Sequence, residues 1–293
     1  MAKYLNYFQF GVGVSGGAEA VLPSANRMLS EHHTDGSLAM LIVDFSNTFN
    51  LVDRSALVHE VERMCPFISL WVNFLYGQAL RLYIGDQHIR FATGVLQGDP
   101  LGPLFFALIL HSLVHKIRNN CKLILHAWYL DDGTVIGDSE EVASVLNIIQ
   151  ANGPGLGLEL NIKKTKIFWS SCDGRKLRAD LFSTDIGSPS LGVKLLGGGG
   201  GEGAVSRDAR FISGLAMKRA VNVVDLMRLL PQLCDLQSEL HLLHSCMGFA
   251  KLFFGLRTCQ PMHIEDATLF FDKGLHGSIE DMVVCGGPFF GDI

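Results

Sequence analysis

The chain has 293 residues, which is ample to bury a hydrophobic core without a disulfide or a metal to hold it. Hydrophobic residues make up 48% and charged residues 18%, a composition that excludes a disordered protein. The net charge of −5 argues against a generally basic protein that coats nucleic acid. That total hides a gradient, because residues 1–160 carry a net −6, residues 161–230 carry +6 and residues 231–293 carry −5.

The first predicted elements are one buried strand and two helices. Residues 38–44 (LAMLIVD) form an apolar run of strand length that is rich enough to be buried on both faces. Asp53 is a good N-cap for a helix that begins at Arg54. A second helical stretch opens at Pro66, and its large apolar residues recur at helical spacing. These residues are Trp71, Phe74 and Leu75.

Two strand hairpins, with a helix between them, occupy the middle of the chain. The first hairpin is predicted to turn at Gly85-Asp86 and the second at Asp131-Asp132-Gly133. Residues 100–117 predict a buried helix that is entered by a polar, glycine-containing loop. The predicted strand pairs are residues 81–84 with 88–92, and residues 122–130 with 134–136.

After the second hairpin, Asp138 or Ser139 caps an amphipathic helix that Gly153-Pro154 ends. Short strands follow near residues 158–160 and 166–169. This order, a run of strands crossed by a few helices on one face, predicts an α+β fold with a mainly antiparallel sheet. The glycine run at residues 197–201 is the best boundary candidate. Beyond it, residues 210–230 and 235–256 predict two helices of a second subdomain.

Three acidic residues stand out because each lies at the end of a buried strand. Asp44 closes the first strand, and Asp131 and Asp132 lie at the tip of the second hairpin. A buried carboxylate costs solvation energy unless a positive charge compensates it. Magnesium suits such a site, because it prefers carboxylate oxygens alongside substrate phosphates, and two ions ~4 Å apart can serve phosphoryl transfer. The alternative is that Asp44 is a turn residue and the D-D-G sequence is only a hairpin loop.

Four motifs resemble the polymerase motifs of reverse transcriptases in their order and spacing. They are LIVDFSNTFNLVD, GVLQGDPLGPLFFALILH, AWYLDDGTVIGD and GLELNIKKTKIFW. The LQGDPLGPL form is similar to the non-LTR retrotransposon branch, with group II intron proteins as neighbours. The resemblance covers about residues 9–203. It implies a right-hand polymerase palm, with an antiparallel sheet and helices on one face, and RNA-directed DNA synthesis as its chemistry.

The resemblance also implies roles for residues of a catalytic centre. Asp44 and Asp131 match the two metal-binding aspartates, and Asp132 is the adjacent acid at a site for two Mg²⁺ ions. The backbone carbonyl of Phe45 is a further expected ligand. Lys164 matches the lysine that protonates the departing pyrophosphate, with a solvated basic face as the alternative.

Other positions match residues that contact the substrates. Phe49, five residues after Asp44, matches the aromatic steric gate that leaves no room for a ribose 2′-hydroxyl, and an ordinary core aromatic is the alternative. Gln97 and Gly98 match the loop that faces the nucleotide and the template. The implied partners are an RNA template, a DNA primer and dNTPs. The expected nucleic-acid contacts are basic side chains, namely Lys163, Lys166 and, in a weaker match to a primer-grip turn, Lys194.

These matches divide the chain into three expected parts. Residues 1–203 are partial fingers and palm, residues 204–260 are a helical thumb-like region, and residues 261–293 are an unassigned tail. Because the match begins near the end of the fingers, we expect a domain truncated at its N-terminus, without the basic residues that grip the incoming triphosphate. Thr48 stands where the family usually has alanine.

Two functions of different classes follow. The first is a metal-dependent RNA-directed DNA polymerase. The second is an inactive relic of the palm that at most binds nucleic acid. The basic side chains available to such a relic are Lys163, Lys164, Lys166, Arg175, Lys176 and Arg178.

The cysteines and the apolar runs indicate an intracellular setting. The seven cysteines are scattered and form no C-x-x-C pair, so neither a zinc knuckle nor a secreted disulfide framework is indicated. Residues 1–4 lack the apolar core of a signal peptide. The longest apolar stretch, residues 101–110, contains Pro103 and is well short of the ~20 residues of a membrane span. We therefore expect a nuclear or cytoplasmic protein that is neither secreted nor embedded in a membrane.

Overall fold

The chain divides into two compact units, Met1–Ser190 and Leu191–Ile293. The computed structural model describes residues 5, 8–96, 98–169, 171, 178–198, 201–206, 208–248 and 250–285. The sequence placed the first boundary at residue 203, whereas the structure assigns the segment after Ser190 to the second unit. The hairpin that includes Lys194 therefore belongs with the helices that follow it.

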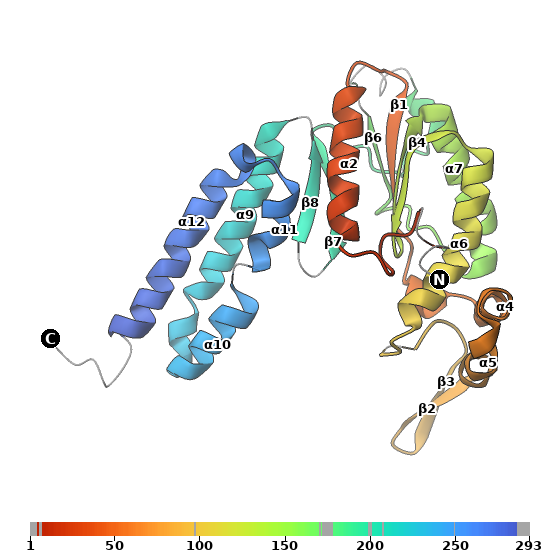
Figure 1. The fold of residues 1–293 in the computed structure, drawn as a ribbon, viewed down its shortest axis with the longest axis horizontal. Helices are drawn as coiled ribbons and strands as arrows, with labels where there is room; N and C mark the ends of the chain where they lie inside the picture. The colour runs from red at the N-terminus through yellow and green to blue at the C-terminus, as the bar shows by residue number, and fades with distance from the viewer. Residues whose placement is uncertain are drawn as a thin grey trace. The chain divides into compact units, whose positions relative to one another are not determined.

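A four-stranded antiparallel sheet forms the centre of the first unit (Figure 1). Its strands, in the spatial order β4-β5-β1-β6, are β4 (Leu123–Tyr129), β5 (Asp132–Asp138), β1 (Leu38–Val43) and β6 (Lys166–Trp169). All three strand pairings are antiparallel. The central strand β1 is apolar along its length because both of its faces are covered, as the sequence predicted.

Helices cover both faces of this sheet. On the face that carries Ala39, Leu41 and Val43, the core includes residues of α4 (Arg54–Met64), α6 (Gly102–Asn120) and α7 (Ser139–Asn152). On the other face, α2 (Gly17–Glu31) packs against β4 and β5 (Figure 1). The sequence predicted helices on one face only. The second layer is required because Leu38 and Met40, which point away from the first layer, are also buried.

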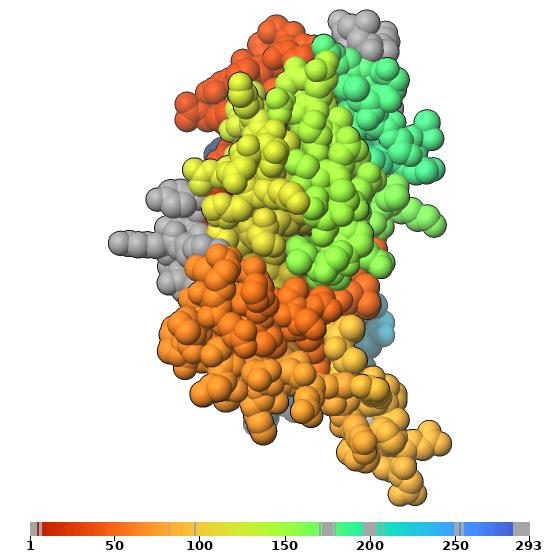
Figure 2. All heavy atoms as spheres, turned by 90° about the vertical axis from the view of Figure 1, so that its right-hand side faces the viewer, coloured from red at the N-terminus to blue at the C-terminus, as the bar shows by residue number. Residues whose placement is uncertain are grey.

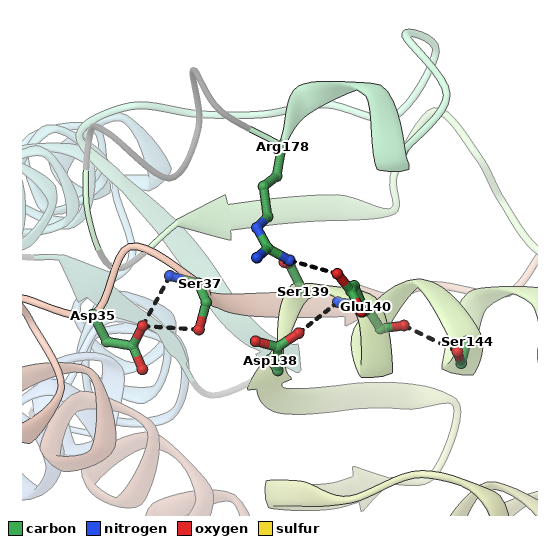
Figure 3. Close-up of polar contacts among 7 residues, drawn as sticks. All are labelled: Asp35, Ser37, Asp138, Ser139, Glu140, Ser144 and Arg178. Atoms are coloured by element: carbon green, nitrogen blue, oxygen red, sulfur yellow. Dashed lines mark hydrogen bonds and ion pairs between the residues drawn. The ribbon is translucent and has the colours of Figure 1, made fainter.

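Two helices begin where side-chain capping predicted. The Asp53 carboxylate accepts a hydrogen bond from the Ala56 amide at 2.7 Å, and α4 starts at the next residue. At the start of α7 the Asp138 carboxylate accepts from the Glu140 amide at 2.9 Å (Figure 3). These bonds satisfy amide groups that have no partner in the first turn of a helix.

The second hairpin turns one residue earlier than the sequence predicted. Tyr129 pairs with Asp132, so the turn consists of Leu130 and Asp131, and Leu130 has a positive φ of 55°. Gly133 lies inside β5 opposite Trp128, where an added Cβ would lie 2.5 Å from the indole ring. Glycine is therefore needed at residue 133 for space beneath a buried tryptophan, and not for the turn.

The segment after α4 buries a different side from the expected one. It consists of a 3-10 turn, Pro66–Ile68, and α5, Ser69–Tyr76. Val72 and Tyr76 are buried, and the Tyr76 ring meets the Phe105 ring of α6 edge-on at 5.7 Å. Trp71 and Phe74, which the helical spacing had singled out, are 45% and 82% exposed. The orientation of α5 is decided by the side on which α6 lies.

A two-stranded hairpin follows α5 and projects from the first unit (Figure 1). Its strands are β2 (Leu80–Ile84) and β3 (Gln87–Phe91). The predicted turn is confirmed, with Gly85 at a φ of 61°. The expected helix at residues 100–117 starts at Gly102, two residues later, and continues to Asn120.

The second unit is a hairpin followed by helices. Its elements are β7 (Gly192–Gly198), β8 (Gly201–Ser206), α9 (Ala209–Met227), α10 (Leu236–Cys246), α11 (Ala250–Thr258) and α12 (Pro261–Glu280). The long helix expected over residues 235–256 is thus two helices. Residues 261–280, which the sequence left unassigned, form α12, and its Phe271 is fully buried in a core shared with Val224 of α9.

The remaining short helical turns connect these elements. They are Thr48–Leu51 (α3), Pro154–Leu156, Ala179–Leu181, Leu230–Leu233 and the π-helical turn Asp281–Cys285. Every helix in the described ranges is too short or too polar to span a lipid bilayer.

Candidate active site

The three acidic residues predicted from the sequence come together at one end of the sheet. Asp44 directly follows β1, Asp131 lies in the turn between β4 and β5, and Asp132 is the first residue of β5. The register pairs Val43 of β1 with Gly133 of β5. Asp44 is consequently placed beside the tip of the neighbouring hairpin, which carries the other two carboxylates.

The backbone of Asp44 is held from the loop that precedes β6. The Asn161 amide donates a hydrogen bond to the Asp44 carbonyl at 2.8 Å, and the Asp44 amide donates to the Thr165 hydroxyl at 3.4 Å. Thr165 is fully buried. Neither supporting residue was singled out from the sequence, although both lie in the fourth motif, GLELNIKKTKIFW.

Phe45 has a buried ring and a backbone that leaves its carbonyl available. Its ring stacks on that of Trp128, with centroids 6.0 Å apart. Phe45 forms an isolated antiparallel bridge with Leu160, in which the hydrogen bonds come from the flanking residues, such as the Ser46 amide to the Glu159 carbonyl at 2.8 Å. In such a pair the carbonyl of the central residue points away from the partner strand.

Burial and neighbouring negative charge raise the pKa values of Asp131 and Asp132. Burial is the main reason that the pKa of Asp132 is raised to about 6, and the charges of Asp131 and Asp44 add to it. The pKa of Asp131 is raised as well, first by burial and then by Asp44. Lys164 opposes both shifts, and its Nζ lies 3.9 Å from Asp44 Oδ1. The structure therefore brings Lys164 to the acidic residues.

These groups suit a divalent cation that a substrate helps to hold. Oδ1 of Asp44 is buried and accepts no hydrogen bond. As the side chains stand in the described residues, no three acids, histidines or cysteines are arranged to enclose a metal ion. Magnesium commonly binds one or two carboxylates and completes its shell with substrate phosphates and water. The carboxylates of Asp44, Asp131 and Asp132 are donors of the kind that such a substrate-assisted site uses.

Thr48 adds a hydroxyl to this group. It begins α3 and is 2% exposed, and its Oγ1 has no hydrogen bond of good geometry. The hydroxyl nonetheless lies near enough to the Asp131 carboxylate to lower its pKa. Asn47, just before it, has a positive φ of 47°, which turns the chain from Asp44 into α3.

The aromatic residue expected to be the steric gate is half-buried in α3. The Phe49 ring stacks on Phe106 of α6, with centroids 4.6 Å apart. The Val95 amide donates to the Phe49 carbonyl at 2.7 Å, so the loop before α6 is tied to the segment that carries Phe49. Stacking on a core ring is equally the arrangement of an ordinary core aromatic.

The loop that contains Gln97 and Gly98 is fastened on both sides by one side chain. Gln97 itself lies outside the described residues, and Gly98 has a φ of 89°, which only glycine adopts readily. The Tyr76 hydroxyl donates to the Asp99 carboxylate at 2.5 Å and accepts from the Leu96 amide at 3.2 Å. This connection was not predicted, because α5 and the loop are 20 residues apart in sequence.

The basic residues fall into separate places. Lys163 is exposed beside Lys164, and Lys166 is half-buried on β6 opposite Ile42. Lys194 is exposed on β7 of the second unit. Arg175 and Lys176 lie outside the described residues.

Arg178 has a structural partner. Its guanidinium pairs with Glu140 at 2.9 Å and donates to the Ser139 hydroxyl at 3.3 Å, at the start of α7 (Figure 3). Asp132 and Asp138 lie at opposite ends of β5, about 20 Å apart at ~3.3 Å per residue. Arg178 therefore lies at the far end of the sheet from the acidic residues.

Comparison with known proteins identifies related sequences. Residues 5–198 match the family model described as reverse transcriptase (RNA-dependent DNA polymerase). The chain is 30% identical over 172 residues to the retrotransposable element SLACS 132 kDa protein of Trypanosoma brucei gambiense. It is 27% identical over 135 residues to the putative 115 kDa protein in type-1 retrotransposable element R1DM of Drosophila melanogaster.

The matches cover 56% and 43% of this chain but only 14% and 13% of the two relatives. Among solved structures, apo telomerase from Candida tropicalis aligns with a TM-score of 0.49 at 14% identity, over 95% of this chain and 46% of that one. Telomerase from Candida albicans aligns with a TM-score of 0.41 at 11% identity, over 96% and 49%. Since the family model spans about two-thirds of the sequence and contains all four motifs, the chain belongs to the reverse transcriptase family.

Proposed function

We propose that the first unit is the palm of an RNA-directed DNA polymerase that transfers dNTPs onto a primer 3′-hydroxyl. The observation that carries this proposal is the convergence of Asp44, Asp131, Asp132 and Lys164 at one end of the antiparallel sheet. Three carboxylates lie together at one end of the sheet, and the pKa values of Asp131 and Asp132 are raised there. They are well suited to a reaction in which phosphates and metal ions bring the compensating charge.

In this proposal Asp44 and Asp131 hold two Mg²⁺ ions, with Asp132 as the adjacent acid and the Phe45 carbonyl as a further ligand. Bound magnesium would activate the primer hydroxyl and neutralise the charge that develops on the phosphates. The protein's contribution is to hold the carboxylates in position before the metal ions and the substrate bind. The bonds from Asn161 and Thr165 hold the Asp44 backbone, and the Thr48 hydroxyl keeps Asp131 closer to its ionised state.

Lys164 has a role of its own in the proposal. Its ammonium group lies 3.9 Å from Asp44 Oδ1 and offsets the negative charge of Asp131 and Asp132. Its side chain is 70% exposed, so it is free to turn toward the leaving pyrophosphate and donate a proton there.

Substrate selection is assigned to Phe49 and to the loop of Gln97 and Gly98. Phe49 would lie beneath the sugar and exclude a 2′-hydroxyl. The loop would face the nucleotide and the template, and the Tyr76 bonds to Leu96 and Asp99 hold its two sides. Lys163, Lys166 and Lys194 are the proposed contacts to the RNA template and the DNA primer. The domain assignment, palm for the first unit and thumb-like for the helices of the second, is part of the same proposal.

A primer-extension assay on poly(A) with an oligo(dT) primer, dTTP and Mg²⁺ tests the function. We expect incorporation that requires Mg²⁺ and disappears in the Asp131→Ala variant. Asp185→Ala is the matched control, because Asp185 is an exposed aspartate of the same unit whose side-chain contact is with Ser183 alone among the described residues.

A folded wild-type chain that incorporates nothing would overturn the polymerase proposal and favour a relic that only binds nucleic acid. An equal loss of nucleotide incorporation in the Asp131→Ala and Asp185→Ala variants would mean that the substitutions act through folding. Thermal melting of each variant separates these outcomes.

A further inference from the structure

A second cationic surface lies on the β2–β3 hairpin, which projects from the first unit (Figure 1). The register places Arg81 directly opposite Arg90, and Tyr83 opposite His88. Because side chains alternate along a strand, these four share one face of the hairpin. All four are exposed, and the hairpin stands clear of the rest of the surface at the lower right of Figure 2.

No acidic side chain among the described residues neutralises the positive charge of Arg81 and Arg90. Like charges directly opposite each other destabilise an antiparallel pair. Among the described residues, neither guanidinium forms an ion pair or a side-chain hydrogen bond. Two other exposed arginines of the unit do have acidic partners: Arg27 pairs with Glu31 and Arg63 with Glu60. The hairpin thus keeps two adjacent positive charges available to a ligand.

A hollow of about 670 Å³ lies at the base of this face. It is lined by Gly77, Gln78, Ala79, Arg81, His88 and Arg90. Two of the three residues between α5 and β2 are small, so this wall of the hollow consists largely of backbone. A compact anionic group can therefore approach both guanidinium groups without displacing a bulky side chain.

A buried arginine keeps the hollow in place. Arg54 of α4 is 5% exposed and donates to the carbonyls of Gly94 at 2.9 Å, Phe91 at 3.2 Å and Gln78 at 3.4 Å. Its guanidinium also lies over the Phe91 ring, 4.6 Å from the centroid. The end of β3 and the chain before β2 are thus tied to one side chain, so the hairpin has an ordered base.

We propose that this face of β2–β3, with the hollow at its base, binds the phosphodiester backbone of a nucleic-acid strand. Arginine matches the geometry of phosphate oxygens with two parallel donors. Tyr83, 66% exposed and 5.7 Å from the His88 ring, adds aromatic surface on which an unpaired base can stack. This combination favours a nucleic-acid strand over an acidic peptide. The identification of the ligand as a nucleic-acid strand rests on the proposed function, whereas the presence of the charged surface does not.

The test is the salt dependence of binding by the Arg81→Ala/Arg90→Ala variant. The probe is a fluorescently labelled 20-nucleotide RNA annealed to a shorter DNA primer, measured by anisotropy without dNTPs. Loss of two phosphate contacts should reduce the slope of log affinity against log salt by roughly 1.4–1.8. Between ~50 and ~200 mM salt, the wild type should therefore weaken roughly tenfold more than the variant.

Two further variants keep the result decisive. Arg27→Ala/Arg63→Ala removes two exposed arginines that already have acidic partners and should leave the slope unchanged. Arg81→Lys/Arg90→Lys keeps both charges and should restore the slope, which excludes misfolding as the cause.

An unchanged slope in the double alanine variant would overturn the proposal. So would equally tight binding of polyglutamate, or a loss of dTTP binding while the strand still binds normally, because these results would identify an acidic peptide or a free nucleotide as the ligand. Since binding is read without synthesis, failure of primer extension would overturn the polymerase proposal alone.

Discussion

Replacing Tyr76 with phenylalanine tests whether one hydroxyl organises the loop that carries Gln97 and Gly98. Tyr76 is 1% exposed, and its ring packs edge-on against Phe105. Phenylalanine keeps that ring and removes only the oxygen. Burial, followed by the bond to Asp99, raises the pKa of Tyr76 to about 12, so the hydroxyl remains a protonated donor at any ordinary assay pH.

The expected loss is the sum of two unequal hydrogen bonds. The bond donated to the Asp99 carboxylate is 2.5 Å long, and a bond to a charged group contributes about 1.5–3 kcal/mol. The bond accepted from the Leu96 amide is 3.2 Å long and contributes about 0.5–1.5 kcal/mol. Asp99 is half-buried and regains some hydration, so we expect a net destabilisation of about 2 kcal/mol.

Urea unfolding followed by tryptophan fluorescence measures this difference. A loss of about 2 kcal/mol lowers the melting temperature by about 4–8 °C in a unit of this size. Tyr83→Phe is the matched control, because Tyr83 is 66% exposed and should change stability by less than about 0.5 kcal/mol. Hydrogen exchange adds a local readout, since the Leu96 amide loses its acceptor and should exchange roughly tenfold faster in Tyr76→Phe.

The functional consequence should appear in substrate binding. We expect a loosened loop to raise KM for dNTP more than it lowers kcat, because the acids proposed to carry the chemistry are not touched. Equal stability of the Tyr76 and Tyr83 variants, with unchanged exchange at Leu96, would refute the reasoning that this hydroxyl fastens the loop.

Three other predictions follow from the site and its support. Folding raises the pKa of Asp132, so its contribution to the free energy of unfolding is present below about pH 4 and is lost as pH rises through about 6. Melting curves of the wild type should show this loss of stability, and those of Asp132→Asn should show a smaller one. Addition of Mg²⁺ at pH 7.5 should restore the stability of the wild type. Gly133→Ala should destabilise the first unit by about 1–3 kcal/mol, because the added Cβ meets the Trp128 ring. Gly155→Ala should have little effect, because the space around residue 155 is open. Equal denaturant midpoints for the two variants would contradict the packing argument. Phe49→Val should raise incorporation of rUTP relative to dTTP, and an unchanged ratio would leave Phe49 as a core aromatic stacked on Phe106.

Much of the fold could be predicted because local patterns carry it. The apolar run that precedes Asp44, the capping aspartates and the turn at Gly85-Asp86 each act within a few residues, and each is found where it was expected. The four motifs placed the acids at strand ends, and antiparallel pairing then brings them together. The catalytic roles of these residues stay predictions until activity is measured.

Other features could not be predicted because they depend on distant partners. The turn at Leu130-Asp131 depends on Trp128 lying across Gly133, which sets the register of the hairpin. The buried side of α5 depends on where α6 lies, so the exposed Trp71 could not be distinguished from a core residue by spacing alone.

The sequence by itself determined the family, most of the strands and helices between residues 38 and 169, and the identity of the acidic residues, because these reside in motifs and short-range periodicity. Only the tertiary structure decided that Tyr76 reaches Asp99, that Thr165 supports Asp44, and that Arg178 is committed to Glu140 at the far end of the sheet. It also revealed that Arg81 and Arg90 face each other without an acidic partner among the described residues. Hydrogen bonds and charge pairs of this kind join residues that are distant in the chain, and no local pattern records which of them meet.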